Sequence, residues 1–131
     1  MGIRNYKTIV SNDFTLRLAI SIILLTHSIP GILNGGIYDF GNLYLNQIGF
    51  APFGVYIAWA VKLSHILCAI SIALNIYMKW ASIITILILF TGIILVHFKE
   101  GWYVVGDGRN GVEYSFLLIC VLLSFLIKVI K

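Results

Sequence analysis

Apolar residues occur along the chain in four long runs, each separated from the next by a short polar or glycine-rich segment. The runs cover residues 14–33, 52–78, 80–98 and 112–130. Each is about as long as the ~20 residues that an α-helix needs to cross a bilayer. The alternating pattern of a membrane β-barrel is absent, and an open sheet would leave edge amides unpaired in lipid. The pattern therefore predicts an all-α fold, an integral membrane four-helix bundle in a single domain.

Residues at the ends of the runs support these boundaries. Asn12 and Asp13 can cap the first helix, and Pro52 suits the first turn of the second helix because it has no amide hydrogen to lose. Pro30 followed by Gly31 is expected to kink or end the first helix. Aromatic residues of the kind that lie at a bilayer surface occur near the helix ends, namely Tyr77, Trp80, Trp102 and Tyr103.

Basic residues are distributed unequally between the two sides of the predicted bundle. One side carries Arg4, Lys7, Arg17, Lys79, Lys128 and Lys131, and the other carries Lys99 and Arg109 together with Asp39, Glu100 and Asp107. Because segments rich in Lys and Arg stay in the cytoplasm, we expect both termini to be cytoplasmic and residues 34–51 and 99–111 to face outward. Arg17 can anchor the topology by extending to the membrane surface, or it pairs internally and links the inner ends of the helices.

The two outward segments are predicted to have structure of their own. In residues 34–51, apolar residues recur at roughly helical spacing between glycines, which predicts a short helix in the membrane interface; they are Phe40, Leu43, Tyr44 and Ile48. In residues 99–111, glycines surround aromatic and charged residues. This pattern predicts a compact, turn-rich lid over the outer ends of the third and fourth helices.

The composition excludes several classes of protein. Hydrophobic residues make up 60 % of the chain and charged residues 11 %, whereas a soluble domain is about half apolar and about a quarter charged. The net charge of +4 comes from basic residues that stand singly at the ends of the runs, so we expect no nucleic-acid binding. Cys68 and Cys120 form no CxxC pair and differ in depth by about 11 Å, so we predict neither a disulfide nor a metal site.

Ionisable residues inside the apolar runs are the candidates for function, because such groups are costly in a membrane. Lys62 lies about 15 Å from the outer end of the predicted second helix, and His65 lies one turn deeper. They share a helix face with alanines at positions 58, 69 and 73, and a face of small residues is expected to point into the bundle. Lys62 needs a counter-charge, and Glu113 in the first turn of the fourth helix can supply it if the lysine stem rises toward it.

Two further histidines lie toward the same side of the bundle. His27 is about 9 Å below the outer end of the first helix, and His97 is near the outer end of the third. With Lys62 and Glu113 they can line one outward-opening cavity; alternatively, each histidine bonds only to a neighbouring carbonyl. A haem with two histidine ligands does not fit, because His27 and His65 differ in depth by about 10 Å and His97 lies almost at the surface.

Four short motifs occur in order along the chain. They are Arg17 in a first helix that ends His27-Ser28-Ile29-Pro30-Gly31, then Gly49-Phe50-Ala51-Pro52 before the second helix, His97 at the end of the third, and Asn110-Gly111-Val112-Glu113-Tyr114 at the start of the fourth. In this order and spacing the motifs resemble the DoxX family of small bacterial four-helix membrane proteins, over residues 14–127. The resemblance adds Tyr114 to the candidate polar centre.

The chain departs from the pattern of that family at two places. The family commonly has a glycine directly after the first-helix histidine and a lysine three residues after that glycine, where this chain has Ser28 and Gly31. It commonly has an acidic residue midway along the second helix, where this chain has Lys62. Compared with the family pattern, the cation thus stands on the second helix instead of the first, and the acidic residue of the second helix is missing. Glu113 is then the expected partner of Lys62.

The resemblance implies a bacterial inner-membrane protein, because its relatives include subunits of thiosulfate:quinone oxidoreductases and proteins linked to thiol and oxidative-stress systems. We expect an accessory or scaffold subunit of a larger membrane or envelope complex, with the lipid bilayer, a partner protein or further copies of the chain around it. The alternative is a component of a quinone-linked oxidoreductase with quinone at the polar centre. The chain has no redox cofactor motif of its own, so no resident cofactor or catalytic residue is predicted. A small transporter is a further alternative, although four short helices enclose little volume.

Overall fold

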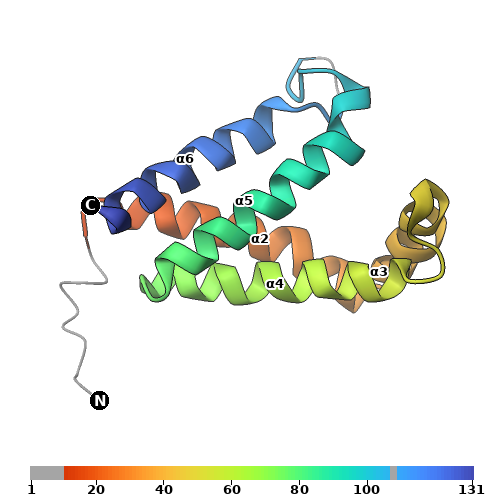
Figure 1. Ribbon diagram of the computed structural model, residues 1–131, viewed down its shortest axis with the longest axis horizontal. Helices are drawn as coiled ribbons and strands as arrows, with labels where there is room; N and C mark the ends of the chain where they lie inside the picture. Colours follow the sequence, from red (N-terminus) through yellow and green to blue (C-terminus); the bar gives the residue numbers. More distant parts are fainter. Residues whose placement is uncertain (1–10, 107–108) are drawn as a thin grey trace. The chain divides into compact units, whose positions relative to one another are not determined.

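All of the regular structure in the computed structural model, which describes residues 11–106 and 109–131, is helical (Figure 1). Helices make up 81 % of the structure, and no strand occurs in the described ranges. Four helices are long and apolar enough to span a membrane, namely α2 (Phe14–Leu33), α4 (Gly54–Leu74), α5 (Met78–Leu95) and α6 (Glu113–Ile130). The predicted all-α class and the four spans are confirmed. Arg4, Lys7 and Asp107 of the topology argument lie outside the described residues.

The chain divides into two compact units, with the boundary between Asn75 and Ile76. The first unit contains α2, the short helix α3 (Gly36–Asp39), the π-helical segment η1 (Phe40–Phe50) and α4. In this unit α2 and α4 pack along their lengths, and η1 packs on α4. The second unit contains α5, the short 3-10 helix η2 (His97–Glu100) and α6, and here α5 packs against α6.

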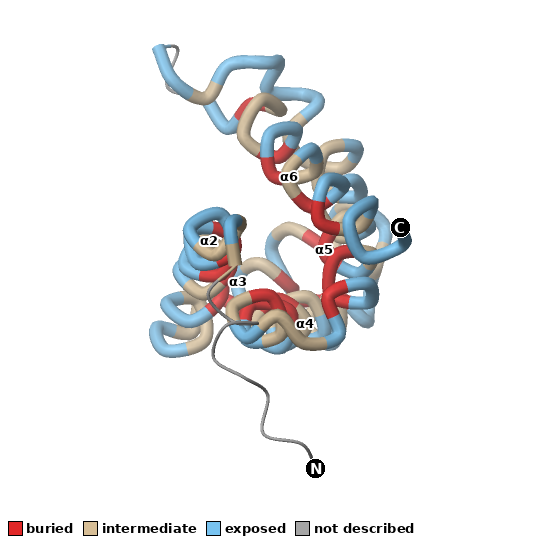
Figure 2. The backbone as a smooth tube through the Cα atoms, turned by 90° about the vertical axis from the view of Figure 1, so that its left-hand side faces the viewer, coloured by how far each residue is buried: buried red, intermediate tan, exposed pale blue. Residues whose placement is uncertain are grey.

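Buried positions form narrow stripes along the long helices, and most of each helix surface is exposed (Figure 2). Only 28 % of an 18-residue apolar stretch is buried in each of α2 and α4, and only 22 % of such a stretch in each of α5 and α6. The exposed positions carry large aliphatic side chains such as Leu16, Leu67, Leu87 and Leu117. Exposing this much apolar surface to water costs about 25 cal/mol per Å², so the helices need a lipid environment, as expected of a multi-pass membrane protein.

A three-residue turn separates α4 from α5, and both helices differ from the predicted ranges 52–78 and 80–98. Asn75 (φ 56°) follows the last residue of α4, and Tyr77 (φ 49°) precedes the first residue of α5. These left-handed backbone conformations interrupt the helical hydrogen bonding, so that α4 ends earlier than its apolar run. At its other end α5 stops at Leu95, because the following residues tighten into η2.

The segment η1 crosses the start of α4 at very short distance. A Cβ atom on Gly41 would lie 2.5 Å from the Cα of Val55, and one on Gly54 would collide with the carbonyl of Gly41, so only glycine fits at both positions. The amide of Gly54 donates to Oδ1 of Asn46 (2.8 Å). Pro52 therefore lies two residues before α4. The prediction that it occupies the first turn was wrong, because the helix begins at Gly54, whose amide is bonded to η1. A helix within residues 34–51 is confirmed; its position in the membrane interface stays a prediction.

Two predictions for the ends of α2 also need correction. Pro30 does not end the helix, which continues to Leu33, and the Pro30 carbonyl accepts a hydrogen bond from the amide of Asn34 (3.0 Å). The alternative, a kink at Pro30, stays a prediction. Asp13 occupies the N-cap position, but its side chain makes no capping hydrogen bond. Its carboxylate instead bonds to the Ser11 hydroxyl and to Arg17. The acidic side chain at this helix end therefore pairs with a buried cation instead of capping the helix amides.

Candidate functional site

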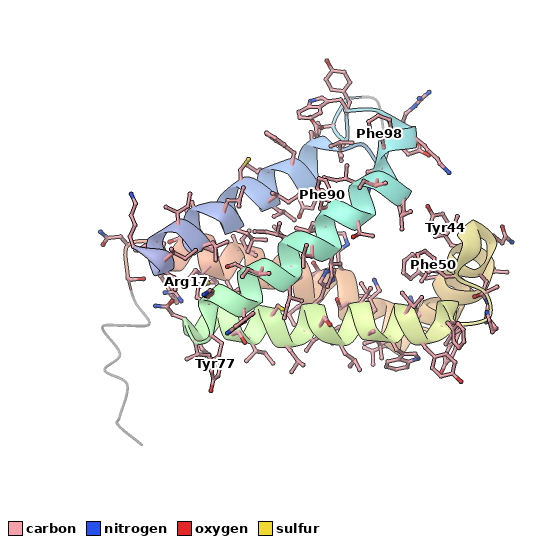
Figure 3. All side chains as sticks on the ribbon, in the orientation of Figure 1. Arg17, Tyr44, Phe50, Tyr77, Phe90 and Phe98 are labelled. Carbon is pink, nitrogen blue, oxygen red and sulfur yellow. The ribbon has the colours of Figure 1, made fainter. Side chains whose placement is uncertain are left out.

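Arg17 is completely buried in the first unit, beside the end of α4 (Figure 3). Its Nη1 donates hydrogen bonds to the carbonyls of Ile72 (3.1 Å) and Ala73 (2.9 Å), and its Nε lies 3.4 Å from the Asp13 carboxylate. The last carbonyls of a helix lack helical partners and carry partial negative charge, so a guanidinium at this point satisfies both. Of the two interpretations of Arg17, the structure therefore shows the internal pairing and not an extension to the membrane surface.

Ser21 provides a further hydrogen bond between the same two helices, one turn further along α2. Its buried hydroxyl donates to the Ala69 carbonyl (2.8 Å) and also lies 2.8 Å from the carbonyl of Arg17. Ala69 is fully buried, and its small side chain lets the two backbones approach closely. The sequence reasoning missed Ser21 because it is uncharged. The available signal was its position four residues after Arg17, on the same helix face.

Lys62 also bonds to the neighbouring helix, with the donor this time on α4 and the acceptor on α2. Its Nζ donates to the carbonyl of His27 (2.6 Å) and lies 5.8 Å from the centre of the Phe40 ring. Gly31 lies beside the lysine stem, since a Cβ atom there would be 3.9 Å from Cε of Lys62. The need of Lys62 for a polar partner is thus met by a backbone carbonyl. The contact involves the main chain of His27, whose side chain is exposed.

Aromatic side chains of η1 border this region. The rings of Phe40 and Tyr44 stack with 5.8 Å between their centres and 10° between their planes. Figure 3 shows Tyr44 and Phe50 on the same side of η1. All three aromatic residues pack against a buried core formed by Ile37, Leu45 and Ala58. This packing fixes η1 on α4 and holds the Phe40 ring close to the Lys62 ammonium.

His65 lies one turn beyond Lys62 and is only 8 % exposed. Within the described part of the chain, neither of its ring nitrogens has a hydrogen-bond partner. The hydroxyl of Ser28 on α2 is likewise buried without one. A buried polar group without a partner is rare because it has given up its bonds with water. His65 therefore combines burial with unused hydrogen-bonding capacity, which is a feature of ligand-binding side chains.

In the second unit, Glu113 organises the loop between η2 and α6. Its Oε1 accepts hydrogen bonds from the amides of Val104 (2.6 Å) and Val105 (2.9 Å), and its own amide donates to the Trp102 carbonyl (3.0 Å). The loop passes so close to Gly111 that a Cβ atom there would collide with the carbonyl of Trp102. These contacts hold residues 102–105 against the start of α6. The predicted lid of residues 99–111, of which 107 and 108 lie outside the described residues, stays a prediction.

His97 closes the same loop at its base. Its Nδ1 lies 2.7 Å from the carbonyl of Asn110, and it carries the hydrogen in this bond because a carbonyl can only accept. This is the arrangement in which a single histidine bonds to a neighbouring carbonyl. Nearby, Tyr114 is half-buried in the first turn of α6, and Arg109 is exposed.

The candidate residues fall into two groups, one in each unit. His27, Lys62 and His65 belong to the first unit, and His97, Glu113 and Tyr114 belong to the second. Within the first unit, the His27 carbonyl and the Lys62 side chain are in direct contact. The joint polar centre of all six residues stays a prediction, as does the pairing of Lys62 with Glu113.

The side chains of the site offer hydrogen-bond donors and positive charge. In residues 11–106 and 109–131, no three His, Cys, Asp or Glu side chains lie close enough together to hold a metal ion. Cys68 is buried and Cys120 is exposed, and the two do not form a disulfide. Comparison of the chain with protein-family models, with curated proteins and with solved structures found no match.

Proposed function

We propose that the chain is a DoxX-like four-helix bundle of the bacterial cytoplasmic membrane, and that it acts as an accessory or scaffold subunit of a larger membrane or envelope complex. Its four apolar helices support the membrane location. The excess of Lys and Arg on the side of the chain ends supports cytoplasmic termini. The ordered motifs from Arg17 to Tyr114 support the family.

The observation that carries the proposed role is how the polar side chains within the spans are used. Arg17, Ser21 and Lys62 each bond to a backbone carbonyl of the neighbouring helix in the first unit. In the second unit, Glu113 and His97 bond to backbone groups of the loop. A catalytic group must be available to its substrate, whereas these groups hold the fold together. Their arrangement favours a structural framework over an enzyme.

A framework of this kind needs a surface for its partner, and the loop of the second unit offers one. The exposed large side chains at this end are Phe98, Trp102, Tyr103 and Val105. Glu113 fixes the backbone at Val105 and directly after Tyr103, because it accepts hydrogen bonds from the amides of residues 104 and 105. An exposed apolar patch whose backbone is held by hydrogen bonds loses little conformational entropy on binding, so residues 98–105 are suited to docking a protein partner.

Affinity purification from native membranes in a mild detergent tests this role. We expect a protein to co-purify in fixed ratio with the wild-type chain and to be lost from the variant Tyr103→Ser. The variant Tyr77→Ser is the matched control, because Tyr77 is also an exposed tyrosine but lies in the turn before α5. Recovery of the wild-type chain as a solitary monomer would count against an accessory subunit.

Reporter fusions test the topology. A reporter that is active only in the cytoplasm should be active when it is attached at the C-terminus and when it is inserted at residue 76. It should be inactive when it is inserted at residue 103. Activity at the C-terminus and at residue 103 together would contradict the proposed orientation.

A second candidate function, a component of a quinone-linked oxidoreductase, has one specific observation in its favour. The buried His65 has unused hydrogen-bonding capacity one turn from Lys62, and a quinone head group presents two carbonyl acceptors at membrane depth. Quinone binding should then weaken in both Lys62→Gln and His65→Leu, but not in Lys79→Gln. Unchanged quinone binding in the first two variants would exclude this candidate.

A further inference from the structure

The Lys62 ammonium is a cation without a balancing anion in its own unit. The described part of the first unit contains two carboxylates, Asp13 and Asp39. Asp13 pairs with Arg17, and Asp39 forms no ion pair with Lys62. A carbonyl and an aromatic face, the groups that Lys62 does contact, attract a cation only through partial charges. A half-buried ammonium therefore retains a net attraction for an anion.

Hydrogen-bonding capacity remains at the same place. An ammonium has three donors, of which one is directed to the His27 carbonyl and another side faces the Phe40 ring. His65, one turn further along α4, adds ring nitrogens that are buried and have no partner among the described residues. A ligand that brings oxygen acceptors and negative charge would satisfy both side chains.

The position of Lys62 indicates which kind of anion can reach it. Lys62 is eight residues after Gly54, or about 12 Å along α4, and helical side chains lean toward the helix start. The carbonyl that it contacts belongs to His27, six residues or about 9 Å before the end of α2. The ammonium thus lies within one side-chain length of the membrane surface on the side of η1, within reach of a lipid head group.

The surroundings of the ammonium are suited to an amphiphile. Phe40 and Tyr44 provide stacked rings on one side. Gly31 presents no side chain beside the lysine stem. The outer surfaces of α2 and α4 expose large aliphatic side chains, including Ile29, Leu33 and Leu63, along which acyl chains can lie.

We propose that Lys62, supported by His65, binds the oxyanion of an acidic lipid, a phosphate or a carboxylate whose acyl chains lie on α2 and α4. The lipid supplies the negative charge that the first unit lacks at this depth. This site is independent of the accessory-subunit role, because it needs neither a partner protein nor the loop of the second unit.

Native mass spectrometry of the purified full-length chain in detergent tests the proposal. The chain is titrated with phosphatidylglycerol and, separately, with phosphatidylcholine of the same acyl chains, and oleic acid is compared with its methyl ester. We expect at least tenfold tighter binding of each acidic lipid than of its uncharged counterpart. We also expect this preference to weaken as salt is raised. Equal binding of acidic and uncharged lipids would overturn the site.

Variants assign the preference to the residue. Lys62→Gln should remove the preference for acidic lipid, Lys62→Arg should retain most of it, and Lys79→Gln, which removes an exposed cation in the first turn of α5, should leave it unchanged. A preference that survives in Lys62→Gln, or is lost equally in Lys79→Gln, would overturn the proposal. If Lys62→Gln fails to fold, the other two variants decide. The site is supported if Lys62→Arg retains the preference for acidic lipid and His65→Leu loses it. The site is contradicted if both variants retain the preference.

Two further ligands separate the lipid from other sources of the same chemistry. Inorganic phosphate alone should neither bind detectably nor displace phosphatidylglycerol, because it lacks the acyl chains. If it binds as well as the lipid, the site is one for a soluble oxyanion and the lipid proposal is wrong. Displacement of phosphatidylglycerol by an uncharged quinone at equal concentration would also overturn the lipid proposal, because the site would then bind a head group that carries no charge.

Discussion

Replacing Arg17 by leucine removes the cation that joins the start of α2 to the end of α4. The substitution makes the helix more apolar, so membrane insertion by itself should improve. Within the folded chain, however, the carbonyls of Ile72 and Ala73 lose a charged donor, and the carboxylate of Asp13 loses its cation. Insertion and folding therefore respond to this variant in opposite directions.

The size of the effect follows from the two hydrogen bonds of Nη1. Side-chain hydrogen bonds inside membrane proteins average about 0.6 kcal/mol, because the inserted but unfolded chain also finds partners. A hydrogen bond to a charged group in a soluble protein contributes about 1.5 kcal/mol or more. Two bonds therefore give a loss of ~1–3 kcal/mol in the free energy of unfolding, or ~5- to 150-fold in the unfolding equilibrium. The Ile72 carbonyl keeps a bond from Asn75 (3.2 Å), which favours the middle of this range.

Unfolding of the purified chain in mixed micelles, with tryptophan fluorescence as the signal, measures this loss. Arg17→Lys keeps the charge but cannot form the same fork of hydrogen bonds, so it should lose about half as much as Arg17→Leu. Lys79→Leu removes an exposed cation and should stay within about 0.5 kcal/mol of the wild type. An Arg17→Leu chain as stable as the wild type, or more stable, would refute the structural role of this residue.

Three further predictions concern the other polar and close contacts. Ser21→Ala should lower the free energy of unfolding by about 0.6 kcal/mol, measured in the same micelles, and no loss would mean that the hydroxyl bonds only within its own helix. Gly54→Ala forces a methyl group into the backbone of η1 and should cost about 1–3 kcal/mol, whereas Gly92→Ala, which meets only ordinary contacts, should be tolerated. In Glu113→Leu the amides of residues 104–105 should exchange hydrogen at least tenfold faster than in the wild type. In Glu113→Gln the increase should be smaller, because the amide oxygen of glutamine still accepts a hydrogen bond. Equal exchange in all three chains would contradict the role of Glu113 in holding these two amides.

The spans were predictable because the need to bury backbone groups in lipid leaves little choice for long apolar runs. Their ends were less predictable. The run 52–78 passes through Asn75 and Tyr77, whose left-handed conformations are not encoded in hydrophobicity, so α4 and the turn that follows it could not be separated. Pro52 suggested a helix start because the sequence does not show that η1 would take the amide of Gly54.

The candidate site was predictable in its members and not in their partners. Lys62 and His65 stood out because ionisable groups in apolar runs are rare. The partners of Lys62 and of Arg17 are backbone carbonyls, which every residue possesses and no sequence pattern distinguishes. The bonds of Glu113 to two loop amides were not predictable either, since they depend on a turn that folds back onto its carboxylate.

The hydrogen bonds between α2 and α4 have a consequence for how this helix pair responds to mutation. Each ends on a main-chain oxygen, at Ala69, Ile72, Ala73 or His27. No substitution at those acceptor positions deletes the acceptor; it changes only the bulk beside it. Mutations that remove these hydrogen bonds are therefore concentrated at the three donors, Arg17, Ser21 and Lys62, whereas a substitution at an acceptor position leaves its carbonyl in place.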